Sequence, residues 1–322
     1  MYNNPPRKGG DCMDKTVNEV YDNYIKYLAL KNKITTNENI KYKFKNYILP
    51  FFGNMKINEV DENTYLEFQV YLKNFKYSNS FYEQVHGMCK NFFNYLSTIY
   101  NIKNISKNIE SIKTDVVYKS NQSKGTFTKK EFKKFIKCVD NKIYHTLFTV
   151  LFFSGIRKGE ALALTINDFK NNCLVINKTI TKELFNGKRQ ILVPKTKKSN
   201  RIVKLDFLTC IQLKQLIKYY STHYSNFNTN FFLFGGDKPI ACTTLERKKN
   251  EYCKKAGVKQ IRIHDFRHSH ATLLYNNDVK VKMIQERLGH SDINITLNTY
   301  VHTDKEQEKR LIKKINLIHT IF

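Results

Sequence analysis

Apolar and aromatic residues recur at helical intervals through the first hundred residues, and this periodicity constrains the fold most. Between positions 17 and 30 they are Val17, Val20, Tyr21, Tyr24, Ile25, Tyr27 and Leu28. Similar apolar faces return around Tyr65 to Leu72 and Phe81 to Leu96. An apolar stripe with a period of about 3.6 residues must be buried against other helices. The first part of the chain is therefore predicted to be a small helical bundle.

Two segments punctuate this bundle. Proline and glycine interrupt the helical pattern at 48–53 (ILPFFG), so we expect a break between helices there. The acidic segment 60–63 (VDEN) provides a capped start for the next helix.

From Asn101 to Lys124 the chain is rich in Asn, Lys and Ser and has little periodicity. We predict the interdomain linker in this stretch, although a solvated edge of either domain would have the same composition.

The second half opens with a capping box and then changes its period. Thr128 supplies the N-cap hydroxyl and Glu131 the carboxylate three residues later. An apolar helix is predicted over Tyr144 to Phe153. After Asp168, short β-prone runs follow at 173–176, 189–193 and 201–205, and Asn186-Gly187 is a hairpin turn signal between the first two. We expect these runs to form three antiparallel strands, with 195–200 at the tip between the second and third.

The predicted fold is mainly α-helical, with a small antiparallel three-stranded sheet. We divide the chain into a polar tail at 1–13, a helical domain at 14–105, a linker at 106–124 and a mixed α/β domain at 125–322. Two domains agree with the length of 322 residues, since one domain typically takes roughly 150.

The chain carries a large positive charge, with 55 Lys and Arg against 28 Asp and Glu and a formal net charge of +27. Lys and Arg that neutralise phosphates release condensed counterions, so the expected partner is nucleic acid. The chain is also rich in Asn, Ile, Tyr and Phe, as an AT-rich coding sequence would produce. The charge therefore permits a polyanionic partner, and the motifs must identify it.

Membrane, disulfide and zinc features are not predicted. No apolar run reaches the roughly 18 residues of a membrane span, and the first ten residues are polar rather than a signal peptide. The seven cysteines (12, 89, 138, 173, 210, 242 and 253) are odd in number and include no C-x-x-C pair. We expect a soluble protein of the reducing cytoplasm.

The second half contains an ordered set of residues that could cleave a phosphate ester. In chain order they are Arg157, Lys195, His264, Arg267, His290 and Tyr300. A phenol of pKa about 10 is a weak nucleophile at neutral pH unless a neighbour takes its proton and cations hold the attacked phosphate. An isolated His or Tyr is usually an ordinary, partly buried residue. The order and spacing of the set therefore carry the inference.

This set resembles the tyrosine recombinase (phage integrase) family throughout its catalytic domain. The matching segments are SGIRKGEALAL, HDFRHSHAT and LGHSDINITLNTYVH, and ILPFFGNMKINEV resembles part of the core-binding domain that precedes them. The resemblance runs from about Asp14 to the end, and implies a helical, SAM-like DNA-binding domain at 14–105 and a catalytic domain at 125–322. Ten positions separate His290 from Tyr300 (300 minus 290), as in integrases of phages and conjugative transposons rather than Xer-type resolvases.

The resemblance implies a role for each member of the set. Arg157 and Arg267 would clamp the non-bridging phosphate oxygens through their planar forks. Tyr300 would attack and become joined to the 3′ phosphate, which conserves the bond energy, so no cofactor is needed. His264 would accept or return the tyrosyl proton.

The remaining two members would act on the leaving group and the phosphate. Lys195 would donate a proton to the departing 5′ oxygen, and Lys197 and Lys198 are alternatives on the same tip. His290 would hydrogen-bond the phosphate and help to fix the helix that carries Tyr300.

Two acidic residues next to the set are expected to support it. Glu160 is predicted to hold Arg157, with a plain surface charge on a helix as the alternative. Asp265 is predicted to cap the helix that begins near Phe266.

Other residues of similar chemistry are assigned no catalytic role. His268 and His270 stand near His264, but no carboxylate or Cys is at ligand spacing, and the resemblance implies no metal. Tyr252 and Tyr275 are rival phenols that lack a motif context, and we expect core or surface positions for them.

The tail 304–322 is predicted to be a helix with one apolar face, made of Leu311, Ile315, Ile318 and Phe322. Packing against its own domain is one interpretation. The family alternative is docking onto a neighbouring protomer, within a homotetramer on double-stranded DNA. An excision factor is a further expected partner, and a membrane is not.

The sequence thus predicts a site-specific DNA recombinase that integrates or excises a mobile element through a 3′-phosphotyrosine intermediate. The alternatives are an Xer-like resolvase, a type IB topoisomerase-like nicking and closing enzyme, and a non-catalytic DNA-binding protein of the same fold. Many integrases carry a further amino-terminal domain that binds arm-type sites, whereas only about fourteen residues precede the first predicted helix. Either the protein acts on core sites alone or the chain starts after that domain.

Overall fold

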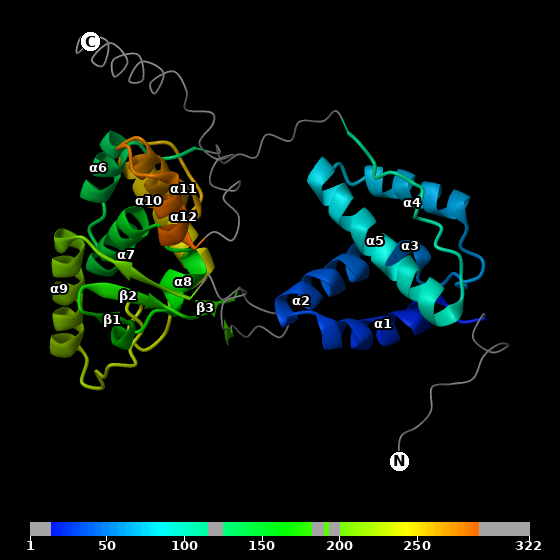
Figure 1. Ribbon diagram of the computed structural model, residues 1–322, viewed down its shortest axis with the longest axis horizontal. Helices are drawn as coiled ribbons and strands as arrows, with labels where there is room; N and C mark the ends of the chain where they lie inside the picture. The colour runs from blue at the N-terminus through cyan, green and yellow to red at the C-terminus, as the bar shows by residue number, and fades with distance from the viewer. Residues whose placement is uncertain (1–13, 115–124, 182–189, 193–199, 290–322) are drawn as a thin grey trace, which may run out of the picture. The chain divides into compact units, whose positions relative to one another are not determined.

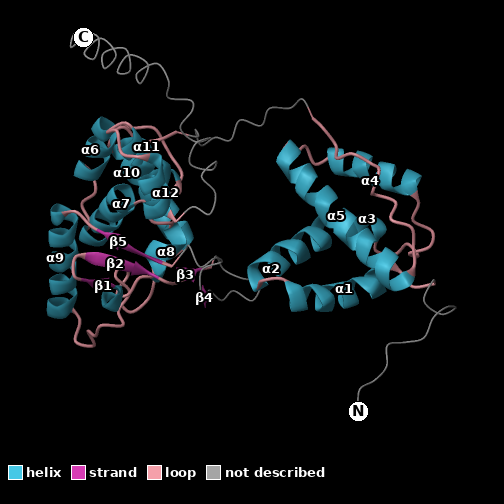
Figure 2. Cartoon of the chain, in the orientation of Figure 1, coloured by secondary structure: helices cyan, strands magenta, loops and turns pink. Residues whose placement is uncertain are grey.

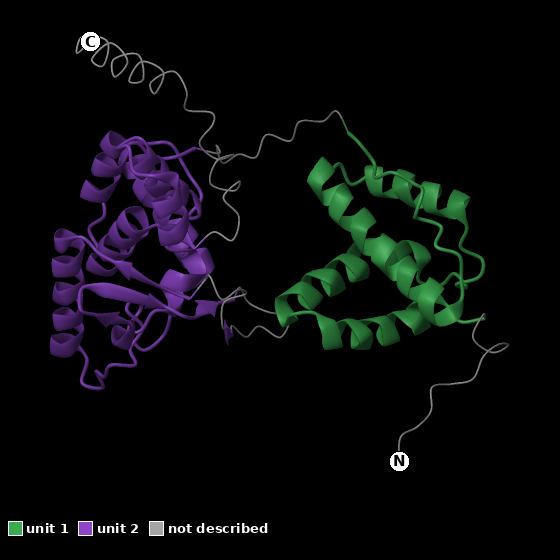
Figure 3. Ribbon diagram, in the orientation of Figure 1, with its two compact units in different colours: residues 1–119 green, residues 120–322 purple. Residues whose placement is uncertain are grey.

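The computed structural model describes residues 14–114, 125–181, 190–192 and 200–289. The chain forms two compact units, residues 1–119 and 120–322 (Figure 3). Each unit is described by itself. None of the described helices is long and apolar enough to cross a membrane.

The first unit is built from helices (Figure 1). They are α1 (Val17–Lys31), α2 (Ile34–Lys43), the π-helical turn η1 (Phe44–Ile48), α3 (Leu49–Phe52), α4 (Glu62–Lys73) and α5 (Asn79–Tyr100). The helices predicted at 17–30, 65–72 and 81–96 are thereby confirmed as α1, α4 and α5. The predicted capped start of α4 is confirmed as well, because Asp61 accepts a hydrogen bond of 2.8 Å from the backbone N–H of Thr64.

The break predicted at 48–53 is confirmed at its glycine but was wrong at its proline, because α3 ends at Phe52 with Gly53 as its C-cap residue. The chain stays helical from α2 through η1 into α3. Pro50, which has no backbone N–H, stands in the first turn of α3, directly after the π-helical turn η1. Helix α2 has a weak apolar face, with only Asn37, Ile40 and Lys43 buried, and the sequence pattern did not indicate it.

Stacked and edge-on aromatic rings fill the core of the first unit. Its large, fully buried side chains include Phe44, Phe52, Tyr65, Phe68 and Phe92. The stretch after α5 also packs on this core through Ile105, Ile109 and Ile112. Asn79 and Thr114 exchange hydrogen bonds of 2.8 and 3.2 Å. Residues 101–114 therefore form an edge of the first unit. Of the linker predicted at 106–124, residues 115–124 lie outside the described residues, and there the linker stays a prediction.

The second unit combines helices with two small sheets (Figure 2). Its helices are α6 (Lys129–Lys137), α7 (Lys142–Ser154), α8 (Lys158–Ala163), the 3-10 turn η2 (Ile166–Asp168), α9 (Phe207–His223), α10 (Cys242–Lys255), α11 (Asp265–Tyr275) and α12 (Val281–Leu288). The predicted capping box is confirmed, because Thr128 and Glu131 bond each other's backbone N–H groups at 3.2 and 2.8 Å. The apolar helix α7 packs against α9 and α11 in the middle of the core.

The strands are β1 (Phe169–Lys170), β2 (Cys173–Ile176), β3 (Thr179–Ile180), β4 (Ile191–Leu192) and β5 (Arg201–Lys204). The three-stranded antiparallel sheet is present, but its predicted membership was wrong. Its order is β1-β2-β5, and Leu174 lies opposite Val203. The run at 189–193 instead supplies β4, which pairs with β3 in a separate sheet.

The pairing of the first strand of the three-stranded sheet is determined by the turn that follows it. Asn171 and Asn172 both have positive φ angles, 50° and 59°. Two consecutive residues of this kind form the tight turn that matches the twist of a two-stranded hairpin. This turn joins β1 to β2 directly. Asn186-Gly187 and the predicted hairpin tip at 195–200 lie outside the described residues, except Asn200 at the start of the segment leading into β5.

A histidine and an arginine tie four elements of the second unit together. Arg287 of α12 donates from Nε to Nε2 of His270 on α11, at 3.0 Å. Since an arginine only donates, Nε2 must be the acceptor and the imidazole proton is on Nδ1. Nδ1 therefore donates to the carbonyl of Phe152 in α7, at 2.9 Å. The other nitrogens of Arg287 donate to the carbonyls of Phe153 and Lys204, at 3.1 and 3.0 Å.

This network requires a neutral imidazole. His270 is buried, and burial, followed by the charge of Arg287, lowers the pKa of its side chain to about 3. A proton on Nε2 would also replace the acceptor that Arg287 needs. The packing is tight here, because a Cβ added at Gly155 would lie 2.5 Å from Cδ2 of His270.

The depressed pKa predicts a loss of stability in acid. The unfolded chain binds a proton at His270 near the ordinary pKa of about 6.5, whereas the folded chain does not, so the contribution is present above that value and is lost as the pH falls toward 3. Between pH 7 and pH 5 the loss is about 2 kcal/mol from this residue. We expect His270→Gln to lower the free energy of unfolding at pH 7 but to reduce its decline toward pH 5.

The measurement is urea unfolding of the full chain at both pH values, followed through the transition of the second unit. His223→Gln, at an exposed position at the end of α9, is the matched control and should keep the wild-type pH dependence. The same pH dependence in wild type and His270→Gln would contradict a neutral, buried His270.

Candidate active site

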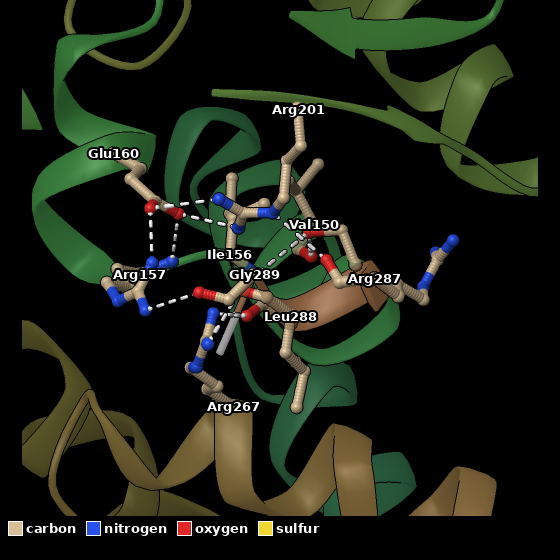
Figure 4. A network of polar contacts seen from close by, with 11 residues as sticks. Val150, Ile156, Arg157, Glu160, Arg201, Arg267, Arg287, Leu288 and Gly289 are labelled. Atoms are coloured by element: carbon tan, nitrogen blue, oxygen red, sulfur yellow. Dashed lines mark hydrogen bonds and ion pairs between the residues drawn. The ribbon is translucent and has the colours of Figure 1, made fainter. Parts of the chain in front are cut away.

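Three arginines from three different elements meet at the carboxyl end of α12 (Figure 4). Each donates to one of three successive carbonyls, and the pairs are Arg201 Nε with Arg287 at 3.0 Å, Arg267 Nη2 with Leu288 at 2.7 Å and Arg157 Nη2 with Gly289 at 3.2 Å. The last carbonyls of a helix have no partner within it and carry the negative end of its dipole. They therefore attract guanidinium groups.

Arg157 is positioned at the start of a helix. It is the N-cap residue of α8, and its backbone N–H donates to Glu160 Oε2 at 2.8 Å. Its Nη1 donates to Glu160 Oε1 at 2.8 Å. Glu160 therefore holds the guanidinium on its buried side, while the Arg157 side chain is 35% exposed and still reaches the surface.

Arg267 lies deeper. It is on the first turn of α11 and is 2% exposed. Its Nη1 donates to the carbonyl of Gly155 at 2.9 Å, two residues before Arg157. The structure thus brings Arg157 and Arg267 to the same place, although 110 positions separate them (267 minus 157). Both also bond the segment that ends directly before His290.

Glu160 is a buried carboxylate between two guanidinium groups. It is 3% exposed, which excludes a plain surface charge. In addition to the two bonds from Arg157, it accepts Arg201 Nη1 on Oε1 at 3.1 Å and Arg201 Nη2 on Oε2 at 2.8 Å. Burial alone would raise the pKa of Glu160, but the bonds and charges of Arg201 and then Arg157 outweigh it and lower the pKa. Glu160 is therefore ionised at neutral pH.

Sequence reasoning missed Arg201. It was read only as the first residue of a β-prone run, and the structure places it on β5, opposite Ile176. A signal was present in the alternation of that strand, because Ile202 faces solvent and Val203 is buried. Arg201 shares the inner face with Val203, and a cation on the inner face of a strand needs a buried partner.

His264 is placed directly before α11, as its N-cap residue. Its ring lies 4.9 Å from that of His268, edge to face. Although His264 is exposed, partial loss of hydration, followed by the neighbouring His268 and Arg267, lowers the pKa of its imidazole below the ordinary value. The neutral imidazole can accept a proton.

The predicted capping role of Asp265 was wrong. Asp265 is the first residue of α11, and no side chain caps this helix. Its buried carboxylate instead turns back to Arg262, where it accepts the backbone N–H at 2.9 Å and Nη2 at 2.7 Å. This pair fixes the turn that leads into His264.

Several predicted residues lie outside the described part of the chain. They are Lys195 with Lys197 and Lys198, His290, Tyr300, and the tail residues Leu311, Ile315, Ile318 and Phe322. The described chain reaches Gly289, which ends α12 with a φ of 67°. His290 follows it directly in the sequence.

Among the rival phenols, Tyr252 is engaged elsewhere. It is buried, its hydroxyl donates to Asp140 Oδ1 at 2.8 Å, and burial raises its pKa to about 12. Tyr275 ends α11 and packs beside Ile284 and Leu288. Within the described ranges, no group of three or more His, Cys, Asp or Glu side chains is arranged to hold a metal ion.

Comparison with known families and proteins identifies the family of the chain. Residues 126–307 match the phage integrase family, and residues 16–73 match the N-terminal SAM-like domain of phage integrases. Over 312 residues the chain is 27% identical to the ICEBs1 integrase of Bacillus subtilis, covering 91% of this chain and 80% of that one. It is 24% identical to the integrase of Staphylococcus phage L54a, covering 93% and 92% of the two chains.

Solved structures share the fold. The Tn1549 transposon integrase in complex with transposon right end DNA superimposes with a TM-score of 0.76 at 19% identity, covering 94% of this chain and all of that one (100%). A lambda integrase tetramer bound to a Holliday junction gives a TM-score of 0.64 at 15% identity, covering 89% and 78% of the two chains.

The mainly α-helical fold with a small antiparallel sheet is therefore that of tyrosine recombinases. The family match spans more than half of the chain and includes the segment in which Arg157 and Arg267 converge. The chain belongs to the phage integrase family, and it is a tyrosine recombinase, an enzyme of site-specific DNA recombination.

Proposed function

We propose that the chain cleaves and rejoins double-stranded DNA by attack of Tyr300 on a phosphodiester held by Arg157 and Arg267, and that it thereby integrates or excises a mobile element. The observation that supports this assignment best is the convergence of the two arginines on the carbonyls of Leu288 and Gly289. Leu288 and Gly289 are the two residues before His290, and they stand 12 and 11 positions before Tyr300 (300 minus 288 and 300 minus 289).

The arginines would stabilise the charge that develops during attack. A five-coordinate phosphorus carries negative charge on its non-bridging oxygens, and charged donors placed beforehand supply a large part of catalysis. Arg157 is held by Glu160 and Gly289 and is still 35% exposed. Arg267 is buried against Gly155 and Leu288, so its charge lies beneath the site.

The remaining residues would move protons. Tyr300 loses its hydroxyl proton to His264 and forms the 3′-phosphotyrosine bond, while the 5′ oxygen leaves and takes a proton from Lys195. The reverse reaction with another 5′ hydroxyl rejoins the strand. His290 would hydrogen-bond the phosphate. The phosphotyrosine bond retains the energy of the broken ester, so the reaction needs no cofactor, and we expect it to take place in the cytoplasm.

The proposed assembly is a homotetramer on DNA, linked by the tail helix. The apolar residues Leu311, Ile315, Ile318 and Phe322 would dock onto a neighbouring protomer. The tetrameric lambda integrase, which has the same fold, is the precedent for a tetramer on a four-way DNA junction. An excision factor would be a further partner during excision.

The nucleophile assignment predicts that Tyr300→Phe forms no covalent adduct. The test is incubation with nicked duplexes that carry the end sequence of the element encoding the chain, followed by denaturing electrophoresis. Tyr252→Phe should still form the adduct, because that phenol is buried and hydrogen-bonded to Asp140. An adduct with Tyr300→Phe would contradict the nucleophile, and no adduct with wild type would favour a protein that only binds DNA.

The phosphate-clamp assignment predicts a strong effect of Arg157→Lys. The substitution keeps the charge but removes the planar fork, so we expect the rate of adduct formation at saturating DNA to fall by about 100-fold. The dissociation constant for DNA should change less than about threefold, since binding is mostly charge-driven. Arg247→Lys, on the exposed side of α10, is the matched control. Equal rates for wild type and Arg157→Lys would contradict the assignment.

The tail assignment predicts that deletion of residues 305–322 leaves a folded protein that binds DNA as a monomer and no longer assembles into tetramers. Analytical ultracentrifugation with and without DNA measures both states, and circular dichroism reports folding. Unfolding of the catalytic unit after the deletion would instead show that the tail packs on its own domain.

A further inference from the structure

We propose that Arg201 is a positioning residue for Arg157. Arg201 acts by binding both oxygens of the Glu160 carboxylate. The inference rests on the proposed function, because it assigns Arg157 to the phosphate. Arg201 is on β5, far in sequence from both of its partners, and its side chain is 8% exposed. It supports the site from beneath the surface.

The hydrogen bonds around Glu160 determine how Arg157 can bind it. A carboxylate accepts about four hydrogen bonds on its two oxygens. Arg201 takes one position on each oxygen, in the parallel two-point geometry that guanidinium and carboxylate prefer. The backbone N–H of Arg157 takes a third. One position is then left for the Arg157 side chain, which binds through Nη1 alone while Nη2 reaches Gly289.

Without Arg201, this division would change. The buried Glu160 would lose two charge-assisted bonds, and the guanidinium of Arg157, which already contacts it, can replace them. A two-point pair between Arg157 and Glu160 would turn Arg157 away from Gly289 and from the segment that leads to His290. Arg201 thus keeps the phosphate-binding arginine in a one-point contact.

The local charge leads to the same conclusion. With Arg201 present, Glu160 faces two guanidinium groups and the cluster of three side chains keeps a positive charge. With Arg201 absent, Glu160 would neutralise Arg157 completely. A neutral pair attracts a phosphate much less than a cation does.

Arg201 also bonds the end of α12. Its Nε donates to the carbonyl of Arg287, beside the carbonyls that Arg267 and Arg157 bind. One side chain therefore fixes the carboxylate that orients Arg157 and the helix end that both catalytic arginines contact.

The test is a double-mutant cycle in the full chain, measured as single-turnover adduct formation on the nicked duplex at saturating concentration. We expect Arg201→Met to reduce the rate by about tenfold or more, as is usual when a supporting partner is removed. The dissociation constant for DNA should change less than about threefold, because one charge among 55 cationic side chains is lost.

The diagnostic result is rescue. In Arg201→Met/Glu160→Gln the carboxylate that would capture Arg157 is gone, so we expect the adduct to form at least about threefold faster than with Arg201→Met alone. The double variant as slow as Arg201→Met, or Arg201→Met at the wild-type rate, would overturn the inference. Arg247→Met, which removes an exposed arginine from α10, is the control for charge alone and should keep the wild-type rate.

Two further measurements keep the outcomes distinct. If Arg201→Met does not fold, Arg201→Lys is compared at a temperature below its thermal midpoint. Lysine keeps the charge but has no planar fork, so a rate below wild type supports the inference and a wild-type rate overturns it. Failure of the wild type itself to form a Tyr300-dependent adduct would count against the proposed function and not against Arg201 alone.

Discussion

The pairing of the buried Glu160 carboxylate with Arg157 and Arg201 is the interaction on which the site in the second unit depends. An ionised group that is removed from water costs several kcal/mol unless it is paired and fully hydrogen-bonded. Glu160 meets this requirement with four donors, from the side chain and backbone of Arg157 and from both Nη atoms of Arg201. Because Arg157 begins α8 and Arg201 begins β5, one carboxylate joins a helix to the three-stranded sheet. The guanidinium groups of both arginines also donate to carbonyls at the carboxyl end of α12.

Arg287 connects this site to the rest of the unit. Its carbonyl accepts Arg201, while its side chain bonds His270 and the carbonyls of Phe153 and Lys204. The last turn of α12 is therefore held on one side by the arginines of the site and on the other by a neutral histidine. A charged His270 would weaken the contact with Arg287, because the proton on Nε2 would face the guanidinium. The geometry of the site thus depends on a neutral imidazole at His270, and the low pKa of this side chain keeps it neutral. The low pKa has no catalytic role.

The sequence predicted what depends on local pattern. Strong apolar periodicity placed α1, α5 and α7, and the capping box placed the start of α6. Local pattern failed where tertiary contacts decide, as in α2, whose face is weakly apolar, and in the sheet, where β2 pairs with β5 across a long insertion. The capping role of Asp265 failed for the same reason. A carboxylate at a helix start bonds whichever donors are nearest, and here the nearest donors are the backbone and guanidinium of Arg262.

The site shows the same division. Arg157 and Arg267 stand in recognisable motifs, whereas the role of Arg201 is evident only from its contact with Glu160, 41 positions away (201 minus 160). Physical chemistry explains why such a partner is needed. Three guanidinium groups around one helix end repel each other, and Glu160 together with the helix dipole, worth about half a charge, offsets only about half of their charge. About 1.5 positive charges remain on this count, which one phosphodiester group would reduce to about half a charge. The arrangement is therefore closest to electrostatic balance when a phosphate is bound, and this makes the cluster suitable for holding one.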